Sequence, residues 1–282
     1  RSLGLISYDK SAVESHTLHD VNEIPAASKS HTNWINITGV DNVDFMRSIQ
    51  QKLGIHPLAM EDIMNTGHRA KVDDFDNFIF LTLKMLKLDD TSKHVVPEQV
   101  SFILREGELI TFQEEPGDTF DPVRKRMTVA TSNLRKYGTD YLTYALLDSI
   151  IDNYVYIIEG LGGKIDDLEL MILDDPDKEV LQMINNYKRD LHLILKVVKP
   201  VNDLLNNIKK SENQLFRDKR IQPFYRDLGD LMIHVLESVE AYRSVLNDYI
   251  QVYGSINTPW VTARKVWNQH GYFVTNINDD LT

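Results

Sequence analysis

Three apolar stripes with helical spacing fill the second half of the chain and constrain its fold more than any other feature. From about Thr139 onward, hydrophobic side chains recur at alternating steps of three and four residues. The first stripe is Leu147, Ile151, Tyr154, Ile158, Leu161, Ile165, Leu168 and Ile172; the second is Val180, Ile184, Tyr187, Leu191, Ile194, Val198, Val201, Leu205 and Ile208; the third is Leu228, Met232, Val235, Val239, Tyr242, Leu246, Tyr249, Tyr253 and Ile256. Such stripes predict three long helices with coiled-coil-like packing.

The third stripe predicts a helix that extends beyond the rest of the chain. If this helix runs from Asp218 to Ile256, a rise of about 1.5 Å per residue makes it roughly 58 Å long. We expect it to project as a stalk, and its far half then needs neighbours that a symmetric homo-oligomer supplies most simply. In the second helix, Asp175 and Pro176 suit the start, and Pro200 should bend the helix.

The first part of the chain, to about residue 135, changes period several times, as alternating strands and short helices should. The predicted strands are Leu3–Tyr8, Ser15–Asp20, Asn33–Ile37, Asn77–Leu88, Gln99–Leu104 and Leu109–Gln113. One helix is expected over Asp41–Leu53, capped by Asp41 and closed by Gly54, and another from Pro57 onward. The sequence therefore predicts an α+β fold, with a mixed sheet flanked by helices and followed by three long helices.

Charge and cysteine content exclude several classes of function. With 31 basic and 42 acidic side chains, the chain has a formal net charge of -11, so we expect no nucleic-acid partner. It has no cysteine, which excludes disulfides, thiolate nucleophiles and iron–sulfur ligation. Its nine histidines form no HExxH pair, and no serine lies in a GxSxG elbow. We therefore expect that the protein is not an enzyme.

Acidic residues form three candidate cation sites. Glu61 and Asp62 are adjacent on the second short helix, and Asp227 and Asp230 stand three residues apart near the start of the third long helix. Either pair could offer oxygen ligands to a hard cation. Seven more acids surround the turn between the first two long helices: Asp166, Asp167, Glu169, Asp174, Asp175, Asp177 and Glu179. This group could attract cations, or it could be a solvated turn with acids suited to a helix N-terminus.

Residues 160–164 have the sequence GLGGK, which is only superficially similar to a phosphate-binding loop. The segment lacks the GxxxxGK[ST] spacing and a preceding strand. Because the first apolar stripe continues through it, we place it inside a helix. Its glycines are then expected to let a neighbouring helix approach or to weaken the helix locally.

Several segments between Asn33 and Met127 together resemble one known family. They are WINITG, GIHPLAMEDI, HRAKVDDFDNFIF, EQVSFIL, FQEEPGD and FDPVRKRM, and similarity continues through DYLTYALLDSIID, KRDL and PFYRDLGD to about Asn257. The chain closely resembles the cytoplasmic part of the CorA family of divalent-cation channels, which import Mg²⁺. The resemblance implies an α/β/α sandwich over residues 1–135 and a long-helix region over 136–257. The last helix, from about residue 218, would be the stalk of a funnel-shaped homopentamer.

The resemblance also implies a location for the chain. In the family, the stalk helix continues into a membrane span that ends in a Gly-Met-Asn motif, and a second span follows. Neither span occurs in this sequence. We therefore expect a fragment on the cytoplasmic side of a protein of the cell (inner) membrane, which cannot conduct ions by itself. Residues 258–282 resemble nothing in the family, and we expect them to have been added during cloning.

The family's regulatory metal sites lie between subunits, and the resemblance indicates their residues. It implies that Asp62 and Asp227 face each other across the subunit interface and share a hydrated Mg²⁺. A second site adds Glu61 and Asp148. Mg²⁺ usually takes one or two carboxylates and keeps several of its waters. We expect bound Mg²⁺ to favour the closed state. Mg²⁺ would then be both the regulatory ligand and the transported ion, and Co²⁺ is a further candidate cargo.

Three alternatives stay open at this point. The first is the cytoplasmic domain of a ZntB-like Zn²⁺ transporter, which shares the scaffold, although all-oxygen ligands favour a hard cation. The second is a soluble metal-dependent hydrolase that uses Glu61, Asp62 and Asp148, and it would require a pocket within one subunit. The third is a structural helical scaffold whose acids bind nothing.

Overall fold

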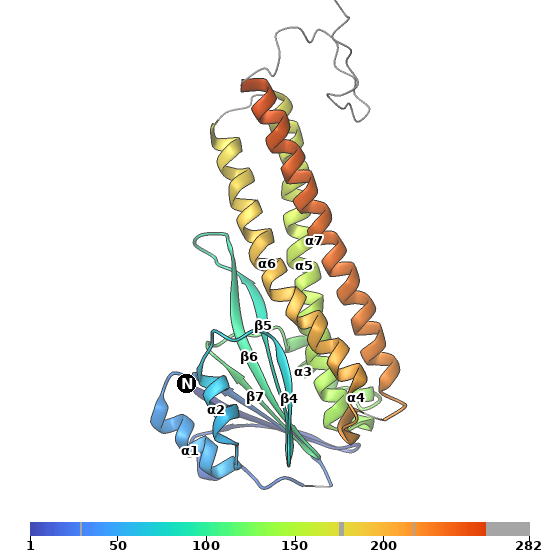
Figure 1. Ribbon diagram of the computed structural model, residues 1–282. Helices are drawn as coiled ribbons and strands as arrows, with labels where there is room; N and C mark the ends of the chain where they lie inside the picture. The colour runs from blue at the N-terminus through green and yellow to red at the C-terminus, as the bar shows by residue number, and fades with distance from the viewer. Residues whose placement is uncertain (29, 175–177, 217, 258–282) are drawn as a thin grey trace, which may run out of the picture.

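A seven-stranded sheet with helices on both faces forms the base of the molecule, seen here in a computed structural model that describes residues 1–28, 30–174, 178–216 and 218–257 (Figure 1). The strands are β1 (Ser2–Tyr8), β2 (Val13–Leu18), β3 (Thr32–Thr38), β4 (Lys71–Phe75), β5 (Phe78–Leu88), β6 (Val95–Arg105) and β7 (Glu108–Gln113). The helices are α1 (Val43–Leu53), α2 (Pro57–Met64), α3 (Asp121–Met127), α4 (Asn133–Lys136), α5 (Thr139–Asp174), α6 (Lys178–Lys210) and α7 (Gln222–Asn257), with 3₁₀ turns η1 (Val21–Glu23) and η2 (Gln214–Phe216). The predicted α+β fold with three long helices is confirmed.

The sheet is mixed, as predicted. Its strand order is β2-β1-β3-β7-β6-β5-β4, in which β3 and β7 run parallel and all other neighbours run antiparallel. Strand β6 begins before the predicted Gln99 and includes Pro97. Because β7 pairs with β6 only from Val100 onward, the first part of β6 has a free edge on that side and tolerates proline.

Two local features differ from the sequence-based predictions. The sequence does not predict β4, because the adjacent Asp73 and Asp74 interrupt its apolar alternation. The cap of α1 is Asn42 rather than Asp41: the Asn42 side-chain oxygen accepts a hydrogen bond from the Phe45 N–H (2.8 Å). The predicted cap was therefore wrong by one residue.

Helices α1 and α2 cover one face of the sheet through short apolar stripes. Gly54 ends α1 in the left-handed conformation (φ 58°), and α2 begins at Pro57, as predicted for both. The buried side chains of the two helices are Met46, Ile49, Leu53, Ala59, Met60 and Ile63. They share one cluster with Ile35, Ile37, Phe80 and Phe112 of the sheet, which fixes α2 on this face.

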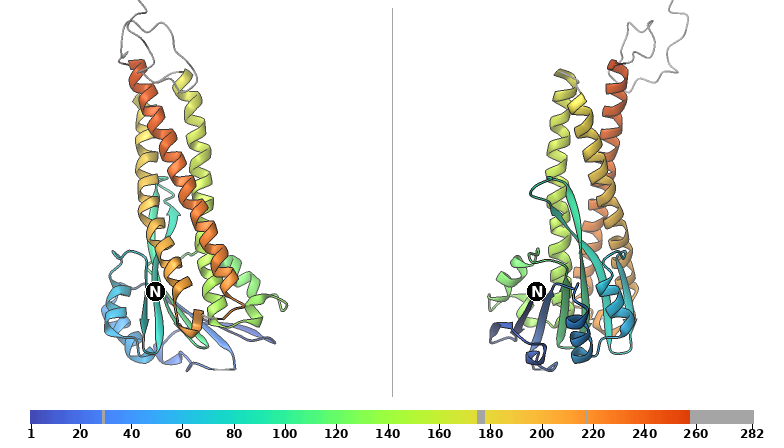
Figure 2. Two further views of the ribbon diagram at one scale, coloured as in Figure 1. Left: turned by 45° about the vertical axis from the view of Figure 1, so that its right-hand side comes forward. Right: turned by 90° about the vertical axis from the view of Figure 1, so that its left-hand side faces the viewer.

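The long helices cover the opposite face and extend well beyond it. Every residue of the first predicted stripe is buried, and the stripe of α7 is buried at Leu228, Met232, Val235, Val239 and Leu246. All three helices run side by side past the end of the sheet (Figures 1 and 2). Helix α7 therefore projects as predicted, and α5 and α6 accompany it and bury its stripe as far as Leu246. Over this part the chain itself supplies the neighbours of α7, and the expected homo-oligomer stays a prediction.

Helix α7 begins at Gln222, and not at Asp218 as the stripe suggested. Asp218 belongs to the preceding turn, where its carbonyl oxygen accepts hydrogen bonds from the N–H groups of Ile221 (2.9 Å) and Gln222 (3.1 Å). Pro223 then occupies the first turn of the helix, where its missing N–H costs no hydrogen bond. The predicted start of α6 at Asp175 and Pro176 and the predicted tail over 258–282 lie outside the described residues.

The glycines of the GLGGK segment lie inside α5, as predicted. A Cβ atom at Gly162 would clash with the Tyr242 hydroxyl of α7, whereas Gly160 and Gly163 face open space. Gly162 therefore allows α7 to pack closely on α5.

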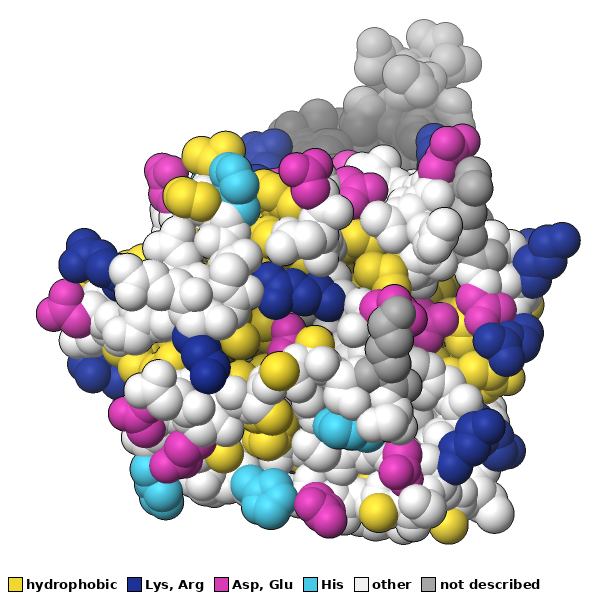
Figure 3. Space-filling view, turned by 90° about the horizontal axis from the view of Figure 1, so that it is seen from below, with side chains coloured by type: hydrophobic (Ala, Val, Ile, Leu, Met, Phe, Trp, Pro, Cys, Tyr) yellow, Lys and Arg dark blue, Asp and Glu magenta, His cyan; other side chains and the backbone are white. Residues whose placement is uncertain are grey.

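At the end of the molecule opposite the helix tips, the surface carries basic and acidic side chains among apolar ones (Figure 3). Across the described ranges, no helix has both the length and the hydrophobicity that a bilayer span requires. The domain boundary near residue 135 and the bend at Pro200 stay predictions.

Candidate functional site

Asp62 lies on α2, and two basic side chains hold its carboxylate. Lys71 Nζ of β4 lies 2.7 Å from Asp62 Oδ2, and His68 Nε2 lies 3.1 Å from Asp62 Oδ1. Gln99 Nε2 of β6 donates a hydrogen bond to the Asp62 carbonyl oxygen (3.0 Å). The Asp62 side chain is only 16% exposed. Its negative charge is thus already compensated within the chain.

Lys71 links two carboxylates, because its Nζ also lies 2.8 Å from Asp73 Oδ2. Burial acts to lower the pKa of Lys71, but its hydrogen bonds to Asp62 and Asp73 outweigh burial and raise that pKa. Lys71 therefore stays charged at neutral pH. Any cation that binds Asp62 has to compete with this ammonium group.

The outer face of α2 combines acid and apolar surface. Leu58, Glu61 and Asp62 stand at positions i, i+3 and i+4, so they share one face of the helix. Leu58 is 60% exposed, and Glu61 is exposed as well. Leu58 thus adds a single exposed apolar side chain to an acidic face.

A second group of carboxylates lies on α5 and at the start of α7. Burial and the charges of Asp152 and Asp227 raise the pKa of Asp148 to about 6, although Arg126 of α3 acts against them. Burial also raises the pKa of Asp152, again opposed by Arg126. Within the described ranges, none of these three carboxylates forms an ion pair. Unlike Asp62, they carry charge that the chain leaves largely uncompensated.

An open groove of about 570 Å³ runs beside two of these carboxylates, between α3 and α5. Its walls include Asp118, Thr119, Asp121, Arg126, Asp148, Asp152 and Tyr156. Tyr156 is 71% exposed and stands eight residues after Asp148, on the same face of α5. This face therefore has the same combination of acid and exposed apolar surface as α2.

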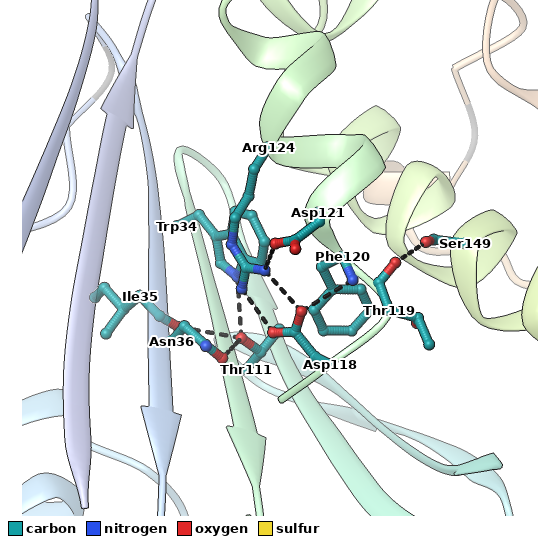
Figure 4. A network of polar contacts seen from close by, with 10 residues as sticks. All are labelled: Trp34, Ile35, Asn36, Thr111, Asp118, Thr119, Phe120, Asp121, Arg124 and Ser149. Carbon is teal, nitrogen blue, oxygen red and sulfur yellow. Dashed lines mark hydrogen bonds and ion pairs between the residues drawn. The ribbon is translucent and has the colours of Figure 1, made fainter. Parts of the chain in front are cut away.

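A polar network fixes the wall of the groove to the sheet (Figure 4). Arg124 binds Asp118 through two hydrogen bonds of 2.6 Å, and its guanidinium group lies 5.1 Å from the centre of the Trp34 ring. The Trp34 ring N–H in turn donates to Thr111 Oγ1 (2.9 Å). Ser149 Oγ of α5 donates to the carbonyl oxygen of Thr119. The network thereby fixes the position of α3 relative to α5.

One chain does not bring the two expected metal ligands together. Asp62 belongs to the helical layer on one face of the sheet, and Asp227 belongs to the layer on the other face. Asp148 and Asp227, by contrast, interact within the chain. In the part of the chain that the structure describes, no group of three or more His, Asp or Glu side chains is arranged to hold a metal ion.

Sequence reasoning missed three residues that shape these faces. Asp152 stands four residues after Asp148, so helical spacing could have identified it. His68 and Lys71 contact Asp62 only because the chain turns back into β4, a strand that the sequence does not predict. Their role therefore had no signal in the sequence.

The acids near the turn between α5 and α6 lie only partly within the described residues. Asp166, Asp167, Glu169 and Glu179 are exposed, and residues 175–177 lie outside the described ranges. The exposure of these four side chains is compatible both with a cation-attracting rim and with a solvated turn. Both interpretations of this group therefore stay predictions.

Comparison with known proteins gives matches over most of the chain. A sequence profile described as "CorA-like Mg2+ transporter protein" matches residues 29–258. The chain is 36% identical over 230 residues to a protein of Thermotoga maritima described as "Cobalt/magnesium transport protein CorA". The match covers 82% of this chain and 65% of that protein, so the chain spans about two thirds of its relative's length.

Two solved structures of separate domains share the fold. One is the soluble domain of CorA from Methanocaldococcus jannaschii, with a TM-score of 0.74, 16% identity and coverage of 89% of this chain and 96% of that chain. The other is the ZntB cytoplasmic domain from Vibrio parahaemolyticus, with a TM-score of 0.71, 12% identity and coverage of 91% and 99%. Because both identities are low, these likenesses concern the fold and do not separate the two kinds of cargo.

Proposed function

This chain belongs to the family of CorA-like Mg²⁺ transporter proteins, and from that premise we propose that it is the cytoplasmic, magnesium-sensing part of a membrane transporter for Mg²⁺. Its relative from Thermotoga maritima is a transport protein and not an enzyme. That relative is described as a cobalt/magnesium transporter, which supports Co²⁺ as a second cargo for the protein proposed here. In this proposal, Mg²⁺ at subunit interfaces favours the closed state.

The observation that carries the proposal is the uncompensated charge of Asp148, Asp152 and Asp227. Their mutual repulsion contributes to the raised pKa of Asp148, and a divalent cation would relieve it. The donors are carboxylate oxygens, which suit a hard cation such as Mg²⁺ better than Zn²⁺. A hydrated Mg²⁺ needs only one or two protein carboxylates, so the face fits this ion without a closed cage.

Asp62 of a neighbouring subunit is the proposed second side of the site. Within one chain, Asp62 and Asp227 lie in different layers, so they could share an ion only across an interface. Exposed apolar side chains flank both faces: Leu58 lies beside Asp62, and Tyr156 lies beside Asp152. Burying them in a homopentamer would add the hydrophobic contribution to association that carboxylates alone cannot supply.

Competition at Asp62 supports a sensing role. Because Lys71 and His68 already hold the Asp62 carboxylate, an arriving ion gains only the difference between the two interactions. Its affinity is then moderate, as a sensor of cellular Mg²⁺ needs. When Mg²⁺ leaves, Asp62 returns to Lys71 while the acids of α5 and α7 repel each other, and the interface loosens. Mg²⁺ thereby shifts the population between two states by its differential affinity for them.

Limited proteolysis of the full-length protein during a Mg²⁺ titration tests this proposal. We expect Asp62→Ala and Asp227→Ala each to raise the Mg²⁺ concentration of half-protection about tenfold, which corresponds to about 1.4 kcal/mol. Asp44→Ala is the matched control, because Asp44 is an acid on α1 with a side chain that is 92% exposed. An unchanged midpoint in the variant that lacks both Asp62 and Asp227 would rule these residues out as the sensor. Protection by Zn²⁺ that Mg²⁺ does not produce at any concentration would favour the ZntB-like alternative.

A further inference from the structure

Arg135 is a buried cation that forms no ion pair with any described acidic side chain. The residue is only 5% exposed and lies on α4. Its Nε donates to the carbonyl oxygen of Asp9, and its Nη1 donates to that of Met127 (3.2 Å). Among the described residues, its buried Nη2 has no hydrogen-bond partner and no acidic side chain forms an ion pair with it. Two carbonyl groups are therefore the hydrogen-bond partners of the guanidinium group among the described residues, and the Asp9 carboxylate acts on its charge without forming an ion pair.

Such an arrangement is costly unless an anion completes it. A buried charge without a counter-charge loses much of its hydration, and an unpaired buried donor adds a further penalty. In a medium of low polarizability, the charge also acts over a longer range than it would in water. Arg135 thus makes its immediate surroundings attractive to an anion.

An open pocket of about 500 Å³ lies beside Arg135, between the ends of β1 and β3 and helix α4. Lys10 and Lys136 are exposed on its walls and add two positive charges. Thr32 contributes a hydroxyl group that can donate to an oxyanion, whereas the Ser11 hydroxyl already donates to Asp9 Oδ1. The pocket shares no lining residue with the groove beside Asp148.

The two acids at the pocket offset only part of this positive charge. Asp9 Oδ1 accepts hydrogen bonds from Ser11 N (2.6 Å), Ser11 Oγ (2.7 Å) and Ala12 N (2.8 Å), and these bonds lower the pKa of Asp9, so its carboxylate stays charged. Glu106 is the other acid on the walls, against three basic side chains. In a chain with a net charge of -11, a pocket with this balance stands out.

We propose that this pocket binds a small phosphate-bearing molecule, with Arg135 as its buried counter-charge and Lys10 and Lys136 as its exposed contacts. A phosphate group carries about two negative charges and several acceptor oxygens, which matches the basic and hydroxyl groups present. A volume of about 500 Å³ lies within the range of small-molecule sites and leaves room for an organic part attached to the phosphate. The site is separate from the metal-sensing function proposed above and does not depend on it.

Isothermal titration calorimetry on this chain tests the proposal in a buffer free of phosphate and sulfate, at constant ionic strength so that screening does not vary. Inorganic phosphate and glycerol 1-phosphate are the two probes, with glycerol as the neutral control. We expect both anions to bind and glycerol to give no heat. Equal affinity would indicate that the site recognises the phosphate group alone, and tighter binding of the ester would indicate contacts to the organic part.

Charge-reversal variants locate the binding. Lys10→Glu and Lys136→Glu should each weaken binding at least tenfold, about 1.4 kcal/mol. Lys164→Glu, an exposed lysine on α5, is the matched control and should bind like the original chain. Arg135→Gln should abolish binding, and a thermal melt checks that this variant folds; if it does not fold, the two lysine variants decide. Absence of heat with both anions up to about 10 mM, or unchanged affinity in both lysine variants, overturns the proposal.

Discussion

The acidic faces of α2 and of α5–α7 look alike in sequence but differ in how their charge is balanced. The Asp62 carboxylate lies 2.7 Å from Lys71 Nζ and 3.1 Å from His68 Nε2. Among the described residues, no basic side chain forms an ion pair with Asp148, Asp152 or Asp227, although the charge of Arg126 acts on Asp148 and Asp152. The α2 face is therefore close to neutral without a bound ion, whereas the α5–α7 face carries an excess of negative charge that a cation would reduce. A cation placed between two subunits would gain most of its binding energy from the second face.

We expect the largest effect on stability when the polar network that supports the α5–α7 face is broken. Arg124→Ala removes both hydrogen bonds to Asp118, whose side chain is 7% exposed, and leaves a buried carboxylate unpaired. We expect a loss of about 3 kcal/mol in the free energy of unfolding, measured by urea denaturation. Arg47→Ala breaks an exposed ion pair with Asp44 and should cost less than about 0.5 kcal/mol. Equal losses in the two variants would contradict the role of the network.

Replacing Lys71, which competes with a cation for the Asp62 carboxylate, tests the α2 face. In Lys71→Met, Asp62 loses the ammonium group that an ion has to displace. We expect the Mg²⁺ concentration of half-protection in the full-length protein to fall about tenfold, or about 1.4 kcal/mol. Lys199→Met, which breaks an exposed ion pair with Glu240, should leave this midpoint where it is. If the Lys71 variant needs more Mg²⁺, the amine assists the ion instead of competing with it.

Neutralisation of Asp148 tests whether the α5–α7 face is under electrostatic strain. A carboxyl group whose pKa is about 6 in the folded state, above its usual value near 4, destabilises the fold when it is ionised. Stability contributed by this group should therefore increase as pH falls from about 7 toward 5. We expect Asp148→Asn to stabilise the Mg²⁺-free chain at pH 7.5 by about 1 kcal/mol, after allowance for solvent screening, and to flatten the pH dependence.

The matched control for Asp148 is Asp203→Asn, which removes an exposed carboxylate from α6. Thermal melts between pH 5 and 8, spanning the pKa of about 6, compare the two variants. Protons and Mg²⁺ compete for the same carboxylate, so Mg²⁺ protection should also weaken below about pH 6 in the original protein. A destabilised Asp148→Asn chain at pH 7.5 would show that the carboxylate is satisfied there.

The smallest effect on chain stability is expected at the apolar surface beside Asp62. Leu58→Ser should change the free energy of unfolding by less than about 0.5 kcal/mol, because Leu58 is 60% exposed. Sedimentation velocity of the full-length protein should nevertheless show weaker subunit association, since the interface loses apolar area. Val43→Ser on α1, at 54% exposure, is the control. If both variants associate like the original, Leu58 lies outside the interface.

Much of the fold could be predicted from local pattern. The three apolar stripes predicted α5, α6 and α7, and Gly54 and Pro57 marked the junction of α1 and α2 correctly. Element ends were less predictable, because Asn42 and Asp41 are both good caps and only backbone geometry selects between them. Strand β4 escaped prediction because its pairing with β5, rather than its own composition, makes it a strand.

Residue type and spacing along the chain were enough to identify which side chains carry charge and which segments have an apolar face to bury. Folding was needed to bring Lys71 to Asp62 and Asp227 near Asp148, and to bury Arg135 with one donor unpaired. The physical reason is that the energy of a charge depends on its distance to other charges and to water. Those distances are set by packing between segments that lie far apart in the sequence.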